Sequence, residues 1–197
     1  MVKYIFASSI DSNKKTGLIA SDTIYSGETI IQERPLICSQ YLWNIEYRYD
    51  ACDFCLTPLE TSEENVRRLS DDETIVLPYK EQCCPTNKST QVACSCNFVR
   101  FCSVDCQTQA WQMYHKVLCP SEQTNSQQHL AIALKELCDF WKSIHYPPET
   151  ASIMLLVKIL ASIKQSINPN EFISKLKEFE SLTDHNEEFV HKLLGNV

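Results

Sequence analysis

The chain has 197 residues, of which 44% are hydrophobic and 22% are charged, and this composition is typical of a folded globular protein rather than a disordered one. Its formal charge of -7 has the wrong sign for a protein that binds nucleic acid through the phosphates. Only three glycines occur, which argues against a glycine-rich phosphate-binding fold. An acidic surface suits a basic partner such as a lysine-rich protein tail, or it serves solubility alone.

The first residues do not form a charged start followed by a long apolar run, so we expect no secretory signal. The best candidate for a membrane span, residues 153–163, is too short and contains Lys158. We therefore expect no membrane association and an intracellular protein in the cytoplasm, the nucleus or both. In a reducing compartment, eleven cysteines indicate metal binding rather than disulfides.

The first 41 residues predict two short strands. Residues 17–20 form the first, Ser26, Gly27 and Glu28 form a turn, and residues 29–37 form the second because apolar and polar residues roughly alternate there. Pro35 belongs at the end or the edge of that strand, since it has no N–H group to donate. Two short strands cannot bury a core alone, so we expect them to pair with strands from elsewhere.

The middle segment, residues 42–120, holds nine of the eleven cysteines. It predicts a short helix over residues 60–69, a polar loop over residues 71–90 and a second helix over residues 103–115. Ser103 can cap the second helix, and Trp111 and Tyr114 then share one of its faces.

The remainder, residues 121–197, predicts a helical bundle. Its first helix carries an apolar stripe at helical spacing, made of Leu130, Leu134, Leu137, Cys138 and Trp141. A second helix over residues 149–167 starts after Pro147 and Pro148 and is apolar on nearly all sides, so we expect it at the centre. Asn168 and Pro169 end it, and two further helices follow over residues 172–179 and 189–194.

Eight potential metal ligands occur in four closely spaced pairs: Cys52 and Cys55, Cys94 and Cys96, Cys102 and Cys106, and His115 and Cys119. Four such pairs suit two closed tetrahedral zinc sites, which are structural rather than catalytic. Simple burial of reduced thiols explains this spacing poorly, although cysteine is often buried. Seven bound thiolates and two zinc ions change the net charge from -7 to roughly -10.

The order of these pairs and the run from Phe101 to Cys119 resemble the MYND zinc finger, whereas RING fingers end in two Cys-x2-Cys pairs. Ligands interleave in MYND fingers, so the resemblance implies one zinc on Cys52, Cys55, Cys102 and Cys106, and another on Cys94, Cys96, His115 and Cys119. Asn97 occupies the family's usual fourth ligand position, one residue after Cys96. Cys96, Cys84 and Cys83 are therefore alternatives for this ligand.

Residues 16–36 resemble the opening of a SET domain, and the finger follows this opening as it does in the SET and MYND family of protein-lysine methyltransferases. Residues 42–55 and 63–69 further resemble the divergent fifth member of that family. The resemblance implies an α+β fold in three parts. These are an incomplete SET β-opening over residues 1–45, a two-zinc MYND finger over residues 46–120 and a helical SET insertion over residues 121–197.

The same resemblance implies methyl transfer from S-adenosylmethionine to a lysine of a histone or another basic protein. It places Thr16 and Gly17 against the methyl donor, although Lys15 replaces the first glycine of the family's Gly-x-Gly turn. Residues 121–197 contain neither the family's Asn-His motif nor its late tyrosine, so we assign no catalytic residue. We expect the chain to be truncated before the catalytic half and inactive alone. The alternative is a non-enzymatic adaptor whose finger binds proline-containing peptides.

Overall fold

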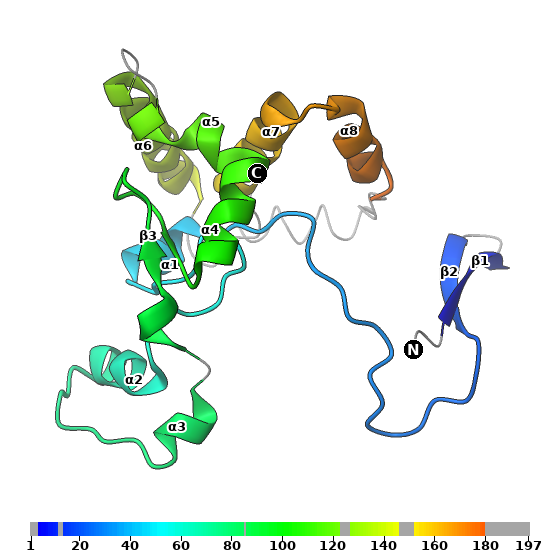
Figure 1. The fold of residues 1–197 in the computed structure, drawn as a ribbon, viewed down its shortest axis with the longest axis horizontal. Coiled ribbons are helices and arrows are strands. Elements are labelled where there is room, and N and C mark those ends of the chain that lie inside the picture. The colour runs from blue at the N-terminus through cyan, green and yellow to red at the C-terminus, as the bar shows by residue number, and fades with distance from the viewer. Residues whose placement is uncertain (1–3, 12–13, 85, 123–126, 146–151, 180–197) are drawn as a thin grey trace. The chain divides into compact units, whose positions relative to one another are not determined.

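The computed structural model describes residues 4–11, 14–84, 86–122, 127–145 and 152–179 (Figure 1). The chain divides into two compact units, residues 1–36 and residues 37–197. The described residues contain helices and two small sheets, which agrees with the predicted mixture of helices and strands. None of the helices described is long and apolar enough to cross a membrane.

The first unit contains an antiparallel hairpin of β1 (Tyr4–Asp11) and β2 (Lys14–Ala20). The strand predicted at residues 17–20 is therefore present, but its partner precedes it in the chain. The strand predicted over residues 29–37 is wrong, because these residues are not in a sheet and most are exposed. The predicted turn is confirmed, since Gly27 has a φ of 89° and the Glu28 N–H donates to the Tyr25 carbonyl at 3.1 Å. An extended segment needs a neighbouring strand to pair its backbone groups. Within the described part of the chain, β1 pairs with β2 and not with residues 29–37.

The second unit begins with a segment of short elements. These are α1 (Leu42–Glu46), α2 (Ser62–Ser70), α3 (Lys80–Cys83), η1 (Lys88–Thr90), β3 (Val92–Ala93), β4 (Arg100–Phe101), α4 (Val104–Ala110), the π-helical turn η2 (Trp111–His115), α5 (Lys116–Leu118) and η3 (Pro120–Glu122). Strands β3 and β4 pair antiparallel.

Side-chain caps explain where the two predicted helices of this segment begin. Thr61 and Glu64 form a reciprocal capping box at the start of α2. The Ser103 hydroxyl accepts a hydrogen bond from the Cys106 N–H at 3.2 Å and starts α4, as predicted.

Three longer helices follow: α6 (Gln127–Ile144), α7 (Ile153–Gln165) and α8 (Pro169–Lys177). The predicted stripe on α6 is confirmed, since all five of its residues are half-buried. Pro147, Pro148 and the predicted helix over residues 189–194 lie outside the described residues. Helix α7 begins at Ile153, later than predicted.

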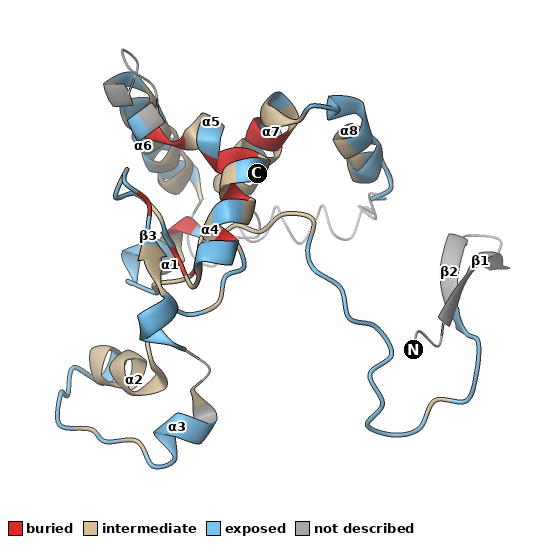
Figure 2. Ribbon diagram, viewed as in Figure 1, coloured by how far each residue is buried: buried red, intermediate tan, exposed pale blue. Residues whose placement is uncertain are grey.

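The most buried residues come from the finger and from α7, whereas α2 and α3 have no buried residue among those described (Figure 2). Helix α7 packs on η2 and α5. The prediction that this helix lies at the centre of a bundle is wrong, because Leu156 and Leu160 of α7 are 50% and 57% exposed. Its buried side instead carries Lys158, Ala161 and Ser162. Apolar residues surround the whole helix, so their pattern could not indicate which side faces the finger.

Candidate metal centre

Cluster 1 consists of the four thiols of Cys52, Cys55, Cys102 and Cys106. The first two lie on a tight turn, in which the Leu56 N–H donates to the Cys52 carbonyl at 2.9 Å. Cys102 follows β4, and Cys106 lies in the first turn of α4. The Sγ atoms of Cys55 and Cys102 are 3.6 Å apart, those of Cys102 and Cys106 are 3.5 Å apart, and those of Cys106 and Cys55 are 3.8 Å apart.

Cluster 2 consists of three thiols and one imidazole, from Cys94, Cys96, His115 and Cys119. Cys94 follows β3, His115 ends η2 and Cys119 follows α5. The His115 Nε2 lies 3.2 Å from the Cys94 Sγ and 3.8 Å from the Cys96 Sγ. The Sγ atoms of Cys94 and Cys119 are 3.7 Å apart.

The structure places Cys96, rather than Cys84, in cluster 2. Asn97 has a left-handed conformation with a φ of 59°, and its N–H donates to the Cys94 carbonyl at 3.0 Å. This tight turn brings Cys96 to the cluster although it comes one residue early. The Cys84 Sγ instead accepts the Ser62 N–H at 3.3 Å. The side chain of Cys83 lies outside the described residues.

The donor atoms of both clusters fit zinc. Sulfur ligands about 2.3 Å from a tetrahedral ion lie about 3.8 Å from one another. The measured separations of 3.2 to 3.8 Å are close to this value, and the donor atoms within each cluster all lie within 4.8 Å of one another. Four sulfurs, or three sulfurs and one nitrogen, form a donor set that zinc prefers. The two clusters therefore fit two zinc ions.

The protonation states also suit a metal. Burial lowers the pKa of His115, so its ring is neutral at pH 7, as a ligand must be. Burial raises the pKa of Cys55, but hydrogen bonds with Thr57, Cys52 and Cys102 outweigh it and bring the value to about 7. Burial raises the pKa of Cys106. Four adjacent thiols thus resist joint deprotonation without a cation, which zinc supplies.

A buried polar network that the sequence pattern does not predict joins cluster 1 to α7. Lys158 is 3% exposed, and its Nζ lies 2.9 Å from the Asp53 Oδ1. It also donates to the carbonyls of Asp53 at 2.6 Å and Cys38 at 3.1 Å. The Tyr114 hydroxyl donates to the Asp53 Oδ2 at 2.9 Å. Lys158 is the only charged residue between positions 152 and 163, and this could have indicated a specific partner.

A cavity of about 320 Å³ lies beside this network. Its walls come from α1, the finger, α6 and α7, and include Leu42, Cys52, Tyr114, Leu134 and Met154. Leu134 and Cys138, two residues of the apolar stripe of α6, line this cavity and are half-buried.

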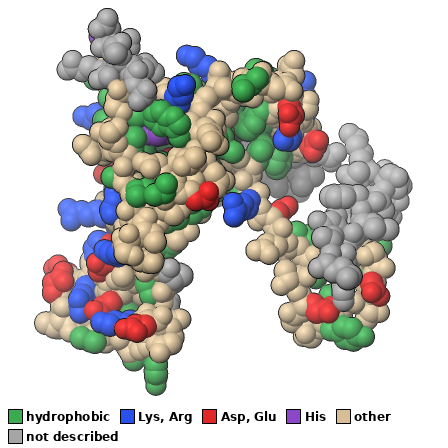
Figure 3. Space-filling model, viewed as in Figure 1, with side chains coloured by type: hydrophobic (Ala, Val, Ile, Leu, Met, Phe, Trp, Pro, Cys, Tyr) green, Lys and Arg blue, Asp and Glu red, His purple; other side chains and the backbone are tan. Residues whose placement is uncertain are grey.

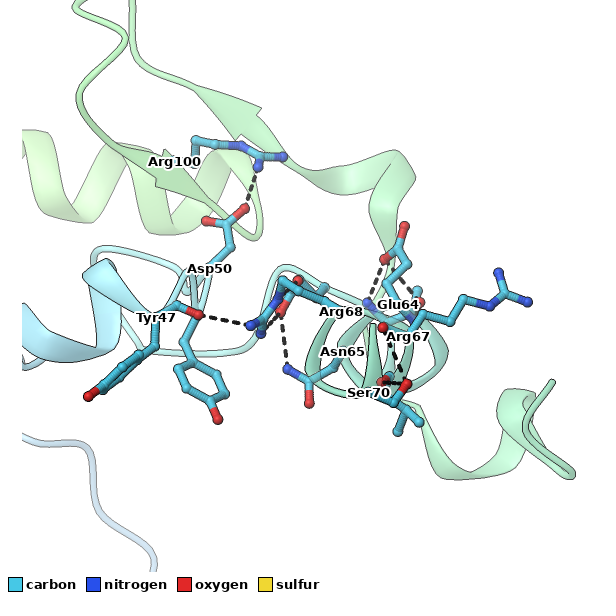
Figure 4. A network of polar contacts seen from close by, with 12 residues as sticks. Tyr47, Asp50, Glu64, Asn65, Arg67, Arg68, Ser70 and Arg100 are labelled. Atoms are coloured by element: carbon cyan, nitrogen blue, oxygen red, sulfur yellow. Dashed lines mark hydrogen bonds and ion pairs between the residues drawn. The ribbon is translucent and has the colours of Figure 1, made fainter. Parts of the chain in front are cut away.

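The segment between the first two ligand pairs forms a charged lobe around α2 and α3. Figure 3 shows acidic and basic side chains side by side over this part of the molecule. Arg68 forms two 2.7 Å contacts with the Glu60 carboxylate and donates to the Tyr47 carbonyl at 2.8 Å, and Asn65 also donates to Glu60 (Figure 4). The lobe is thus ordered by polar contacts rather than by a core of its own.

Thr16 and Gly17, predicted to contact the methyl donor, lie within β2 rather than in a turn. They pair with Ser8 and Ala7 of β1. This hairpin belongs to the first unit, and the metal clusters belong to the second.

Comparison with known proteins agrees with this geometry. Residues 82–119 match the MYND finger family. The chain is also 44% identical over 188 residues to the human protein-lysine N-trimethyltransferase SMYD5, covering 95% of this chain and 44% of that protein. The chain thus resembles a SET and MYND family protein over nearly its whole length. The SMYD5 proteins of chicken and zebrafish are 41% and 42% identical to it and match it over a similar span. No solved structure matches.

The similarity covers only part of the relatives and only part of the two clusters. The chain spans less than half the length of the SMYD5 proteins it matches. The matched MYND span holds six of the eight cluster residues, and Cys52 and Cys55 lie before it. The structure brings these two cysteines to Cys102 and Cys106, as the resemblance to a MYND finger implies.

Proposed function

We propose that this chain is the zinc-finger-bearing part of an S-adenosylmethionine-dependent protein-lysine methyltransferase. The observation that carries this proposal is the pair of clusters, whose interleaved order is that of a MYND finger, in a chain resembling curated lysine trimethyltransferases over 95% of its length. The substrate is a lysine of a histone or another basic protein. The acidic composition of the chain is consistent with such a partner.

The proposed zinc ligands are Cys52, Cys55, Cys102 and Cys106 for one ion, and Cys94, Cys96, His115 and Cys119 for the other. Because protein atoms complete both tetrahedra, neither ion has a position for substrate, and their role is structural. The finger then serves as a base on which α7 docks. Methyl transfer itself depends on S-adenosylmethionine, which supplies the methyl group.

The proposed domain organisation follows the family. Residues 1–45 begin a split SET domain, residues 46–120 form the finger and residues 121–197 begin a helical insertion. Thr16 and Gly17 contact the methyl donor in this proposal. The matching relatives are named as protein-lysine methyltransferases. Their names do not favour the alternative function, a non-enzymatic adaptor that binds proline-containing peptides.

A chimera tests the proposal. In the human relative, the segment that matches this chain is replaced by the chain itself, and transfer of labelled methyl groups to histones and other basic proteins is measured. We expect the chimera to transfer methyl groups, and we expect the same chimera with Cys106→Ser to lose zinc and activity together. A chimera that is folded and contains two zinc ions but binds no methyl donor would overturn the proposal.

A further inference from the structure

The two clusters differ in how far their residues are exposed to solvent. In cluster 1, Cys55 is exposed and Cys102 is half-buried. In cluster 2, Cys94, His115 and Cys119 are buried, and the most accessible member, Cys96, is only half-buried. Since solvent-borne reagents attack accessible thiolates first, the clusters should differ in reactivity.

We propose that cluster 1 is a peroxide-sensitive zinc site whose oxidation releases Lys158 of α7 from the finger. The reacting edge consists of Cys55 and Cys102, whose sulfur atoms are 3.6 Å apart and come from segments 47 residues apart in the chain. The proposal rests on the zinc assignment given above.

The reaction balances with hydrogen peroxide as the oxidant. The Cys55 thiolate attacks one peroxide oxygen, the O–O bond breaks and a sulfenic acid forms. The Cys102 thiolate then attacks this sulfur, an S–S bond forms and the sulfenic oxygen leaves as water. Two thiolates lose two electrons, and one peroxide with two protons becomes two waters. The zinc ion has then lost two of its four ligands and dissociates.

Asp53 connects this chemistry to α7. It lies between Cys52 and Cys55 on the turn that cluster 1 holds in place, and both its carboxylate and its carbonyl bind the Lys158 ammonium. When the turn loses its metal, these acceptors move away from Lys158, and a buried ammonium without them is strongly unfavourable. The middle of α7 must therefore leave the finger or take up water.

The far end of α7 is held separately. The Gln165 side chain donates to the carbonyls of Trp111 and Gln112 and accepts the Val117 N–H at 3.2 Å. These residues flank His115, a member of cluster 2. Oxidation of cluster 1 alone therefore frees the middle of the helix around Lys158 and leaves the Gln165 end in place.

The experiment treats the zinc-loaded 197-residue chain with hydrogen peroxide. Released zinc is followed with a chromogenic chelator, disulfides are mapped by mass spectrometry, and lysine accessibility is measured by acetylation with an amine-reactive ester. We expect one equivalent of zinc to leave about tenfold faster than the second, together with a Cys55–Cys102 disulfide. Acetylation of Lys158 should rise in the same phase to approach that of Lys164, an exposed lysine of the same helix.

Two variants keep the outcome interpretable. Cys55→His retains four ligands, with the donor set of cluster 2, and should slow the first release while keeping two zinc ions. Cys84→Ser removes a thiol outside both clusters and should change nothing. A starting content other than two zinc ions per chain refutes the zinc assignment itself. Two bound ions released at equal rates, or release with Lys158 still protected, overturns this inference alone.

Discussion

Asn97 shows how a single backbone conformation determines a ligand set. Its left-handed turn lets Cys96 complete cluster 2 from a position one residue short of the usual spacing. Sequence spacing left three cysteines as alternatives, because spacing does not reveal φ. Asparagine adopts the left-handed conformation more readily than most other non-glycine residues. The asparagine at position 97 was therefore the one sequence feature that indicated this turn.

Replacing Asn97 tests this role. Asn97→Val places a β-branched residue at positive φ, which costs about 1–2 kcal/mol, so the affinity of cluster 2 for zinc should fall roughly tenfold. Asn97→Gly adopts the same φ without strain and should bind as the natural chain does. Competitive zinc titration of the two variants measures the difference. Equal affinities would show that the turn does not hold Cys96 in place.

Glu60 gives the charged lobe a defined pH dependence. Its hydrogen bonds with Arg68 hold its pKa below the value of 4.5 that it has when unperturbed. The resulting stabilisation is therefore complete above about pH 4.5 and is lost as the pH falls through the lower, folded pKa. Glu60→Gln should lower the free energy of unfolding by about 1–2 kcal/mol at pH 7, and its deficit relative to the natural chain should shrink in acid.

Denaturant unfolding at several pH values between 7 and 3 measures this deficit. Glu73→Gln, which changes an exposed glutamate in the loop after α2, is the matched control and should show no deficit. A deficit that stays constant down to pH 3 would show that the carboxylate charge of Glu60 does not stabilise the lobe.

The helices that the sequence predicts correctly are those whose signals lie in their own or directly adjacent residues. The Ser103 cap predicts the start of α4 and the apolar spacing predicts α6, because each signal lies within or directly beside the element. The hairpin partner of β2 and the orientation of α7 depend on tertiary contacts, which no local pattern contains. The metal-ligand pairs could be identified because the two members of each pair are close in the sequence. Asp53 and Lys158 could not, because they are 105 residues apart in the chain.

Helix α7 should depend strongly on its one buried charge. Lys158→Met leaves Asp53 without its cation in a site that is only partly open to water, and we expect a loss of about 3 kcal/mol in the free energy of unfolding. The double variant Asp53→Leu with Lys158→Met should recover most of this loss, since no unpaired charge remains. Thermal and denaturant unfolding measure both.

Lys164→Met provides the control for this pair of variants, because it makes the same change at an exposed position of α7. It should alter stability by less than about 0.5 kcal/mol. A double variant that is less stable than Lys158→Met alone would contradict the proposed pairing.

At the scale of the molecule, metal and helices should form one cooperative unit within residues 37–197. Because α7 packs on η2 and α5, a strong chelator should unfold the finger and also reduce the helical signal. Far-ultraviolet circular dichroism before and after chelation measures this, and readdition of zinc should restore the spectrum. An unchanged helical signal after complete zinc removal would show that the helices are independent of the finger.

The interleaved order of the ligands also has a consequence for how the finger is made. As the chain grows from its N-terminus, Cys52, Cys55, Cys94 and Cys96 are available before Cys102 exists. These four thiols are a complete zinc donor set, but they belong to two different clusters. Early metal capture therefore produces a misliganded intermediate, and Cys102 and Cys106 must displace Cys94 and Cys96 before the native sites form. Ligand exchange, rather than helix formation, should then limit the rate at which this finger matures.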